Sequence, residues 1–219
     1  MKNLFTLISI GIIMLALTGC SDDSKPRTKA VFMLLDTSGT YTNELGKAQK
    51  IINYLLGTLD SGDSLAVARI DSGSFSEKDI ISKVTFDAKP SSSNAQKRRF
   101  KRIMDEFIAT VKSSPYTDIS GGVLQASEFL NETGAGEKTI LIFSDLEEEL
   151  IKGHIRNFDI PLVDIRVVAL NVTKLRSDNV DPRDYLNRLD SWEKRVVAGG
   201  GLWHVVNDLE HLNKLLIKG

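Results

Sequence analysis

Apolar residues along this chain fall into two patterns, one typical of buried strands and one of amphipathic helices. Short, nearly continuous apolar runs predict strands that are buried on both faces of a sheet. These runs are residues 30–35, 65–70, 139–143, 162–170 and 202–206. A further run, 80–86, fits a strand at the edge of the sheet that can pair antiparallel with its neighbour.

Apolar residues that recur every three or four positions predict helices between these strands. The predicted helices are residues 43–59, 94–112, 119–130, 181–198 and 208–217. The stretch 94–112 shows the pattern most clearly, with one apolar face from Phe100 to Val111. Asp181 followed by Pro182 is a typical helix start, a capping carboxylate and then Pro at the first position.

Strands and helices alternate almost throughout, which indicates a Rossmann-like α/β fold with a mostly parallel sheet and helices on both faces. We find no internal repeat and no break in composition, so residues 30–219 are expected to form a single domain. Residues 90–93 and the polar stretch 171–180 are expected to be loops.

The first twenty residues have the pattern of an export signal. Lys2 precedes an apolar run from Leu4 to Leu17, shorter than the about 20 residues that a spanning helix needs. The run ends in Leu17-Thr18-Gly19-Cys20, which resembles the lipobox of bacterial lipoproteins, and Cys20 is the one Cys of the chain. The alternative is an ordinary secretory signal followed by a chance Cys.

The lipobox resemblance implies that residues 1–19 are removed and that Cys20 is lipidated. Residues 20–29 would then be a polar tether, and the acyl chains would hold the protein on a membrane. Ser21, where related lipoproteins can carry Asp, favours the outer membrane facing the periplasm; otherwise the outer face of the plasma membrane is expected. We therefore expect a lipid-anchored protein of the cell envelope.

Charge and composition exclude several other classes. Lys and Arg number 28 against 29 Asp and Glu, so the net charge is −1 and nucleic acid is not an expected partner. The hydrophobic fraction of 42% is too high for a disordered chain. Three scattered His and one Cys argue against a His- or Cys-based metal centre, and the sequence has no Gly-rich phosphate loop.

Oxygen-bearing side chains follow the predicted strands where ligands bind in an open parallel sheet, outside the carboxyl ends of the strands. Asp36, Ser38 and Thr40 follow the first strand, Thr117 precedes the helix 119–130, and Asp145 follows the strand 139–143. Oxygen donors without His or Cys suit a hard divalent cation, Mg²⁺ first, with Mn²⁺ or Ca²⁺ as alternatives. Each residue could instead be a turn former or a helix cap.

The three motifs, in this order, resemble the metal-ion-dependent adhesion site of von Willebrand factor A domains, written Asp-x-Ser-x-Ser, a distant Thr and a distant Asp. Here Thr40 replaces the final Ser and keeps its hydroxyl. The resemblance implies that Ser38, Thr40 and Thr117 contact the ion, while Asp36 and Asp145 hold its waters. It covers about residues 29–219, except that this chain lacks the Gly that usually follows the last Asp.

The resemblance implies a binding protein rather than an enzyme, in which a protein partner supplies an Asp or Glu carboxylate to the metal. One alternative is a structural or assembly lipoprotein with an inactive metal site. Another is a metal-dependent hydrolase or phosphotransferase with Asp36 as nucleophile, but such enzymes need a second acid where this chain has Ser38. The sequence makes no prediction of the oligomeric state.

Overall fold

The computed structural model describes residues 26–71, 76–175, 177–207 and 211–214, without the side chains of Thr40 and Ser177. Its centre is a six-stranded sheet in the order β3-β2-β1-β4-β5-β6. The strands are β1 (Lys29–Asp36), β2 (Ser64–Ile70), β3 (Ile80–Thr85), β4 (Glu137–Phe143), β5 (Ile165–Leu170) and β6 (Leu202–Val206). All neighbours pair in parallel except β2 and β3, which confirms the expected antiparallel edge strand.

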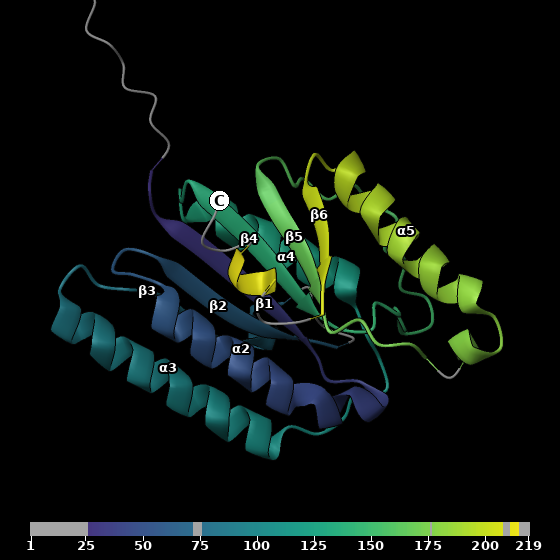
Figure 1. Ribbon diagram of the computed structural model, residues 1–219, viewed down its shortest axis with the longest axis horizontal. Helices are drawn as coiled ribbons and strands as arrows, with labels where there is room; N and C mark the ends of the chain where they lie inside the picture. The colour runs from purple at the N-terminus through teal and green to yellow at the C-terminus, as the bar shows by residue number, and fades with distance from the viewer. Residues whose placement is uncertain (1–25, 72–75, 176, 208–210, 215–219) are drawn as a thin grey trace, which may run out of the picture.

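Helices cover both faces of this sheet (Figure 1). Their bounds are α2 (Leu45–Thr58), α3 (Pro90–Thr110), α4 (Ile119–Glu132) and α5 (Pro182–Ala198), with short 3₁₀ helices η1 (Gly39–Glu44), η2 (Glu77–Asp79) and η3 (Ser177–Asn179). Helices α2 and α3 pack on one face, and α4 and α5 on the other. The predicted α/β class, with a mostly parallel sheet in a single domain, is confirmed.

The alternation of side chains along the central strand explains the two cores. In β1, Phe32 and Leu34 belong to the core shared with α4 and α5. Met33 and Leu35 belong to the core shared with α2 and α3. A strand that is buried on both faces needs apolar residues at every position, and this is why β1 reads as a continuous apolar run.

Several element boundaries differ from the expected ones. Helix α3 begins at Pro90, so the expected loop 90–93 is wrong and forms the first helical turn, where Pro is tolerated. Helix α2 begins at Leu45, after η1, rather than at residue 43. Strand β5 begins at Ile165 rather than at 162, because the chain turns at Asp164, whose φ is 61°. Of the expected helix 208–217, residues 211–214 are described and helical.

The expected export signal and tether fall largely on residues 1–25, which lie outside the described residues, and so do Cys20 and Ser21. Within the described part of the chain, none of the helices combines the length and apolar character needed to cross a bilayer.

Candidate metal centre at the carboxyl edge of the sheet

Three of the five predicted site residues line one polar hollow at the carboxyl edge of the sheet. Ser38, Thr117 and Asp145 contribute to its wall, and its volume is about 400 Å³. Asp36 lies beside it at the end of β1, next to Ser38. Thr40 belongs to η1, but its side chain is outside the described set. The structure therefore gathers the segments that the sequence singled out.

The Asp36 carboxylate connects the loop after β1 with the end of β4. Asp36 is only 1% exposed. Its Oδ1 accepts a hydrogen bond from the Ser38 backbone N–H at 2.8 Å, and its Oδ2 accepts one from the Ser144 hydroxyl at 2.6 Å. The Ser144 hydroxyl in turn accepts a bond from the Leu146 N–H at 3.0 Å. A buried carboxylate held by such donors fixes the relative position of two loops far apart in sequence.

Main-chain hydrogen bonds join the three loops of the site. The segment at Ser114 pairs with the loop after β1: the Ser114 N–H donates to the Thr37 carbonyl at 2.7 Å, and the Gly39 N–H donates to the Ser114 carbonyl at 3.2 Å. The segment at Thr117 pairs with the loop after β4, because Thr117 and Glu149 exchange two hydrogen bonds of 2.8 and 3.0 Å. The loop after β1, the segment 114–117 and the loop after β4 are therefore held together by main-chain hydrogen bonds around the hollow.

The residue that follows Thr117 fixes the start of α4. The Asp118 carboxylate caps the helix by accepting a hydrogen bond from the Gly121 N–H at 2.8 Å. It also pairs with Arg156, whose Nη2 lies 2.6 Å from Asp118 Oδ2. Because Thr117 is 1% exposed and adjoins this buried ion pair, its position at the edge of the hollow is well defined.

Electrostatics at the hollow favour a positive ion. Burial raises the pKa of the Asp145 carboxyl to about 6, and the negative charge of Asp36 adds to this shift, while a hydrogen bond from the Glu147 N–H and the nearby Arg188 oppose it. Glu147 and Glu149 also line the hollow, whereas no Lys, Arg or His is among the described lining residues. A cation between the loops would offset the repulsion between these carboxylates.

Leu146 directly follows Asp145, in the loop where von Willebrand factor A domains usually have Gly, and it adopts a backbone conformation typical of Gly. Its φ is 69°, the left-handed conformation that Gly adopts without a steric penalty. Its side chain is 1% exposed and belongs to the core on the α4 and α5 side. Its carbonyl accepts a hydrogen bond from Trp192 Nε1 at 3.1 Å. The loop therefore has a glycine-type turn although the residue is Leu.

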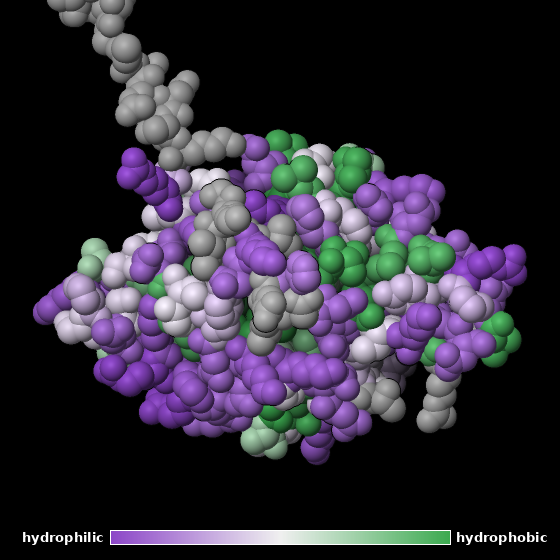
Figure 2. Space-filling view, viewed as in Figure 1, coloured by the Kyte–Doolittle hydropathy of each residue, from purple (hydrophilic) through white to green (hydrophobic). Residues whose placement is uncertain are grey.

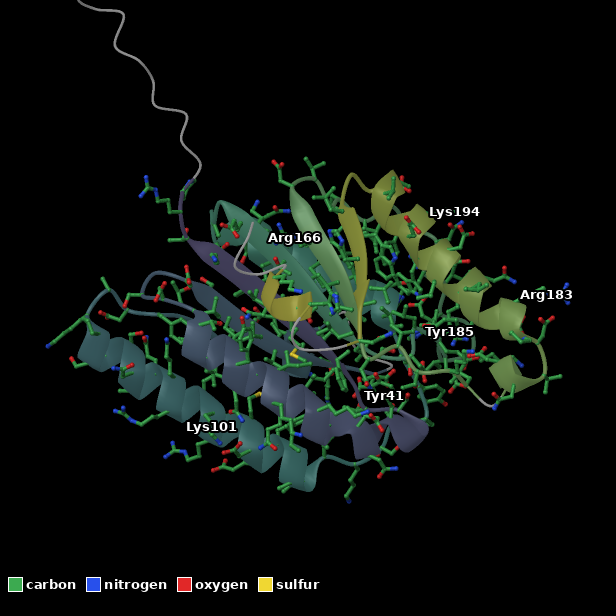
Figure 3. All side chains as sticks on the ribbon, in the orientation of Figure 1. Tyr41, Lys101, Arg166, Arg183, Tyr185 and Lys194 are labelled. Carbon is green, nitrogen blue, oxygen red and sulfur yellow. The ribbon has the colours of Figure 1, made fainter. Side chains whose placement is uncertain are left out.

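Two residues that sequence reasoning did not single out also shape the site. Tyr41, labelled in Figure 3, lines the hollow. Its hydroxyl donates to the Asn171 carbonyl at 2.8 Å, and burial holds the pKa of Tyr41 well above its usual range. Arg188 donates to the Asp145 carbonyl at 2.8 Å and pairs with Asp178 at 2.9 Å. Both interactions join positions distant in sequence, and only a conserved pattern across relatives could have indicated them.

The residues present fit a hard divalent cation. In the described ranges no group of three or more His, Cys, Asp or Glu side chains is placed to hold a metal, so a site here must use hydroxyl oxygens as well. Ser38 and Thr117 supply hydroxyls at the hollow, and Asp36 and Asp145 supply negative charge beside them. Hydroxyl and carboxylate oxygens are ligands that Mg²⁺ and Mn²⁺ accept.

Comparison with known proteins gives the fold. No protein-family model matches the sequence, and a search of curated proteins found no match. Among solved structures, the chain is similar to a von Willebrand factor type A protein from Catenulispora acidiphila, at 12% identity and a TM-score of 0.52, over 86% of this chain and 41% of that one. The chain has a von Willebrand factor A-like fold.

A second solved structure supports the same fold. The pilus adhesin SpaC from Lactobacillus rhamnosus GG, in its open conformation, matches over 90% of this chain and 30% of its own, at 12% identity and a TM-score of 0.51. This chain thus spans less than half the length of either of these proteins. Similarity at such identity establishes the von Willebrand factor A-like fold and leaves function to the site itself.

Proposed function

We propose that this chain is a lipid-anchored binding protein of the cell envelope, whose von Willebrand factor A-like domain engages a protein partner through a divalent cation. The observation that carries the proposal is the hollow in which Ser38, Thr117 and Asp145 meet beside the buried Asp36. Three loops distant in sequence meet there, and their main chains are hydrogen bonded to one another. Such convergence is not expected of unrelated turn and cap residues.

In this proposal the hydroxyls of Ser38, Thr40 and Thr117 contact the ion. Asp36 and Asp145 act mostly through its waters, since both Asp36 oxygens already accept hydrogen bonds from the protein. Mg²⁺ is the favoured ion, with Mn²⁺ or Ca²⁺ as alternatives. The bound ion would supply an electrophilic position that a carboxylate from the partner can fill.

Metal binding should raise the thermal stability of the protein. We expect Mg²⁺ or Mn²⁺ to increase the melting temperature of the full chain carrying Cys20→Ser, because a ligand that binds only the native state adds about 2.7 kcal/mol at a concentration of 100 times its Kd. Ser38→Ala and Asp145→Asn should reduce the increase, and chelator should reverse it. Scanning calorimetry measures each shift.

The matched control is Asp159→Asn, an exposed acid outside the residues that line the hollow. It should keep the full metal-dependent shift. The metal site would be contradicted if neither ion changed the melting temperature of the wild-type protein. It would also be contradicted if Ser38→Ala kept the full metal-dependent increase in melting temperature.

The proposed partner is a protein that presents Asp or Glu, and the proposed membrane anchor is lipidated Cys20. Ser21 favours the outer membrane facing the periplasm over the outer face of the plasma membrane. A pull-down from envelope extract, performed with and without chelator, tests the metal-dependent partner directly. Recovery of the same proteins in both conditions would contradict the proposed mode of binding.

A second candidate function is a structural or assembly lipoprotein whose metal site is inactive. It is favoured by the Asp36 hydrogen bonds, which join the loops through protein groups. The hydrolase or phosphotransferase alternative is less favoured, because a nucleophile must reach its substrate and Asp36 is 1% exposed. Metal-dependent phosphatase turnover that disappears in Asp36→Ala would restore that alternative.

A further inference from the structure

Two carboxylates on the rim of the hollow at the candidate metal centre, those of Glu147 and Glu149, have no counter-charge of their own. Both residues line the hollow and both are exposed. Neither side chain forms a hydrogen bond or an ion pair within the described part of the chain. Glu148, between them, differs: its Oε1 accepts the Ser120 N–H at 2.6 Å, and its Oε2 lies 3.5 Å from Arg195 Nη1. The acids on either side of Glu148 can therefore meet a ligand.

The backbones of these two rim acids are held next to residues of the proposed metal site. The Glu147 N–H donates to Asp145 Oδ1 at 3.0 Å. The Glu149 N–H donates to the Thr117 carbonyl at 3.0 Å, and the Thr117 N–H donates to the Glu149 carbonyl at 2.8 Å. A molecule that reaches an ion between these loops therefore comes close to both rim carboxylates.

Two hydroxyls of the hollow are available to a ligand. Thr117 is 1% exposed and lines the hollow, yet its hydroxyl has no hydrogen-bond partner among the described residues, and neither has that of Ser38. Of the unpaired side-chain N and O atoms in the described ranges, Gln125 Oε1 alone is sealed from solvent, so the Thr117 hydroxyl opens into the hollow. An unpaired hydroxyl on a buried residue is unfavourable and indicates a ligand there.

The charge balance of the site disfavours a partner that brings only a carboxylate. Asp36, Asp145, Glu147 and Glu149 carry four negative charges when ionised, and no Lys, Arg or His is among the described lining residues. A divalent cation leaves two of these charges uncompensated, and a partner carboxylate on the ion makes three. The nearby arginines do not offset this charge, because each is paired with another acid: Arg188 with Asp178 at 2.9 Å, Arg156 with Asp118 at 2.6 Å and Arg195 with Glu148 at 3.5 Å.

We propose that the partner segment which supplies the carboxylate also carries a Lys or Arg one or two residues away, and that Glu147 and Glu149 bind this cation. This inference rests on the proposed function, in which a partner carboxylate reaches the ion. Consecutive residues of an extended segment are about 3.5 Å apart, so a long cationic side chain beside the carboxylate can meet the rim. Charge complementarity of this kind selects partners and rejects wholly acidic segments.

Synthetic peptides that share a central Asp test this inference. The Asp is flanked by Lys in the first peptide, by Ser in the second and by Glu in the third. Each peptide is titrated, with Mg²⁺ present, into the full chain carrying Cys20→Ser, and proton–nitrogen NMR of the backbone amides of residues 145–149 gives the affinity. The Lys-flanked peptide should bind about tenfold more tightly than the Ser-flanked peptide, and the Glu-flanked peptide should bind most weakly.

Removal of both rim charges should abolish this preference. In Glu147→Gln/Glu149→Gln, the affinities of the Lys-flanked and Ser-flanked peptides should lie within about twofold of each other, and the Glu-flanked peptide should bind more tightly than it does to the wild-type chain. The matched control is Glu128→Gln/Glu132→Gln, which removes two exposed charges further along α4, outside the residues that line the hollow. This control should keep the preference of about tenfold.

The possible outcomes separate this inference from the proposed function. If none of the peptides binds in Mg²⁺, or if a Lys-flanked peptide with Asn in place of Asp binds as tightly, the proposed capture of a carboxylate is contradicted and this inference with it. If the Asp peptides bind and chelator releases them, but the flanking residues make no difference, only the inference is overturned. A preference that persists in the rim variant, or that is lost equally in the control variant, would also overturn it.

Discussion

Leu146 has a backbone conformation that is unfavourable for its side chain, and burial of that side chain compensates. A left-handed φ costs a non-Gly residue roughly 1–2 kcal/mol. Burying a Leu side chain contributes a similar or larger amount, and Leu146 is 1% exposed with a φ of 69°. The turn after β4 is therefore stable because its residue is anchored in the core.

We predict that Leu146→Ala destabilises the protein more than Leu146→Gly does. Both variants lose the buried side chain, at about 2–5 kcal/mol for Leu→Ala, but only Gly also relieves the backbone strain. The free energy of unfolding of the Gly variant should therefore be higher than that of the Ala variant by about 1 kcal/mol, and the Gly variant should unfold at a higher denaturant concentration. Chemical denaturation of both variants measures the order, and an Ala variant more stable than the Gly variant would contradict the account.

The residues of the proposed metal site could be picked out from the sequence, but the residues that contact them could not. Asp36, Ser38, Thr117 and Asp145 could be found because each follows or precedes a predicted element. Ser144 Oγ binds Asp36 across 108 positions, and Arg188 binds the Asp145 carbonyl across 43. Contacts at such separation depend on how elements pack, which local patterns do not encode.

At the scale of elements, Gly residues in the first turn of α4 leave room for close packing of this helix against β1. A Cβ at Gly122 would lie 3.1 Å from Leu34 Cδ2, and one at Gly121 would lie 2.8 Å from Asp118 Oδ2. The same carboxylate caps α4 and pairs with Arg156. The helix start and the Thr117 loop therefore depend on a small residue at position 121.

We predict opposite effects for Ala at two helical Gly positions. Gly121→Ala should destabilise by about 1–3 kcal/mol, because the added methyl group displaces the Asp118 cap. Gly46→Ala, in the first turn of α2 with open space around it, should stabilise by up to about 1 kcal/mol. Thermal unfolding of the two variants compares them directly, and a Gly121→Ala protein as stable as the Gly46→Ala protein would exclude this role of Asp118.

The nature of nearly every element could be predicted, whereas their ends could not. Continuous apolar runs identified the strands because the sheet is buried on both faces. The start of α3 was missed because Pro90 and three Ser read as a loop, yet Pro and Ser are both acceptable in a first turn. The sequence places the start of β5 too early, at Leu162, because Leu162 is apolar like the strand residues. In the structure Leu162 is buried but lies before the turn at Asp164.

The surface of the whole molecule differs from one side to the other. Figure 2 shows hydrophilic side chains over α3 and a gathering of hydrophobic ones near α5 and β6. The exposed apolar side chains of this second region include Leu186, Val197 and Leu202. These apolar side chains come from α5 and from β6, two neighbouring elements at this edge of the sheet.

We predict that Cys20→Ser releases the protein from the membrane fraction. Acyl chains contribute about 0.8 kcal/mol for each buried CH₂ group, so loss of the acylated Cys should abolish stable anchoring. Fractionation of cells that express the wild-type and the variant chain, together with labelling by palmitate, measures this. Retention of Cys20→Ser in the membrane fraction at the wild-type level would contradict the lipid anchor.

The loops around the hollow are fastened through peptide groups, at Ser38 with Ser114 and at Thr117 with Glu149. Every residue type except Pro carries the same backbone N–H and C=O groups, so side-chain substitutions at the rim leave these hydrogen bonds in place. The side chains of Glu147 and Glu149, which line the hollow, can then differ between related chains without loss of the backbone hydrogen bonds that join the loops. Substitution of these acids would therefore change the charge at the rim of the hollow while the backbone that forms its wall stays the same.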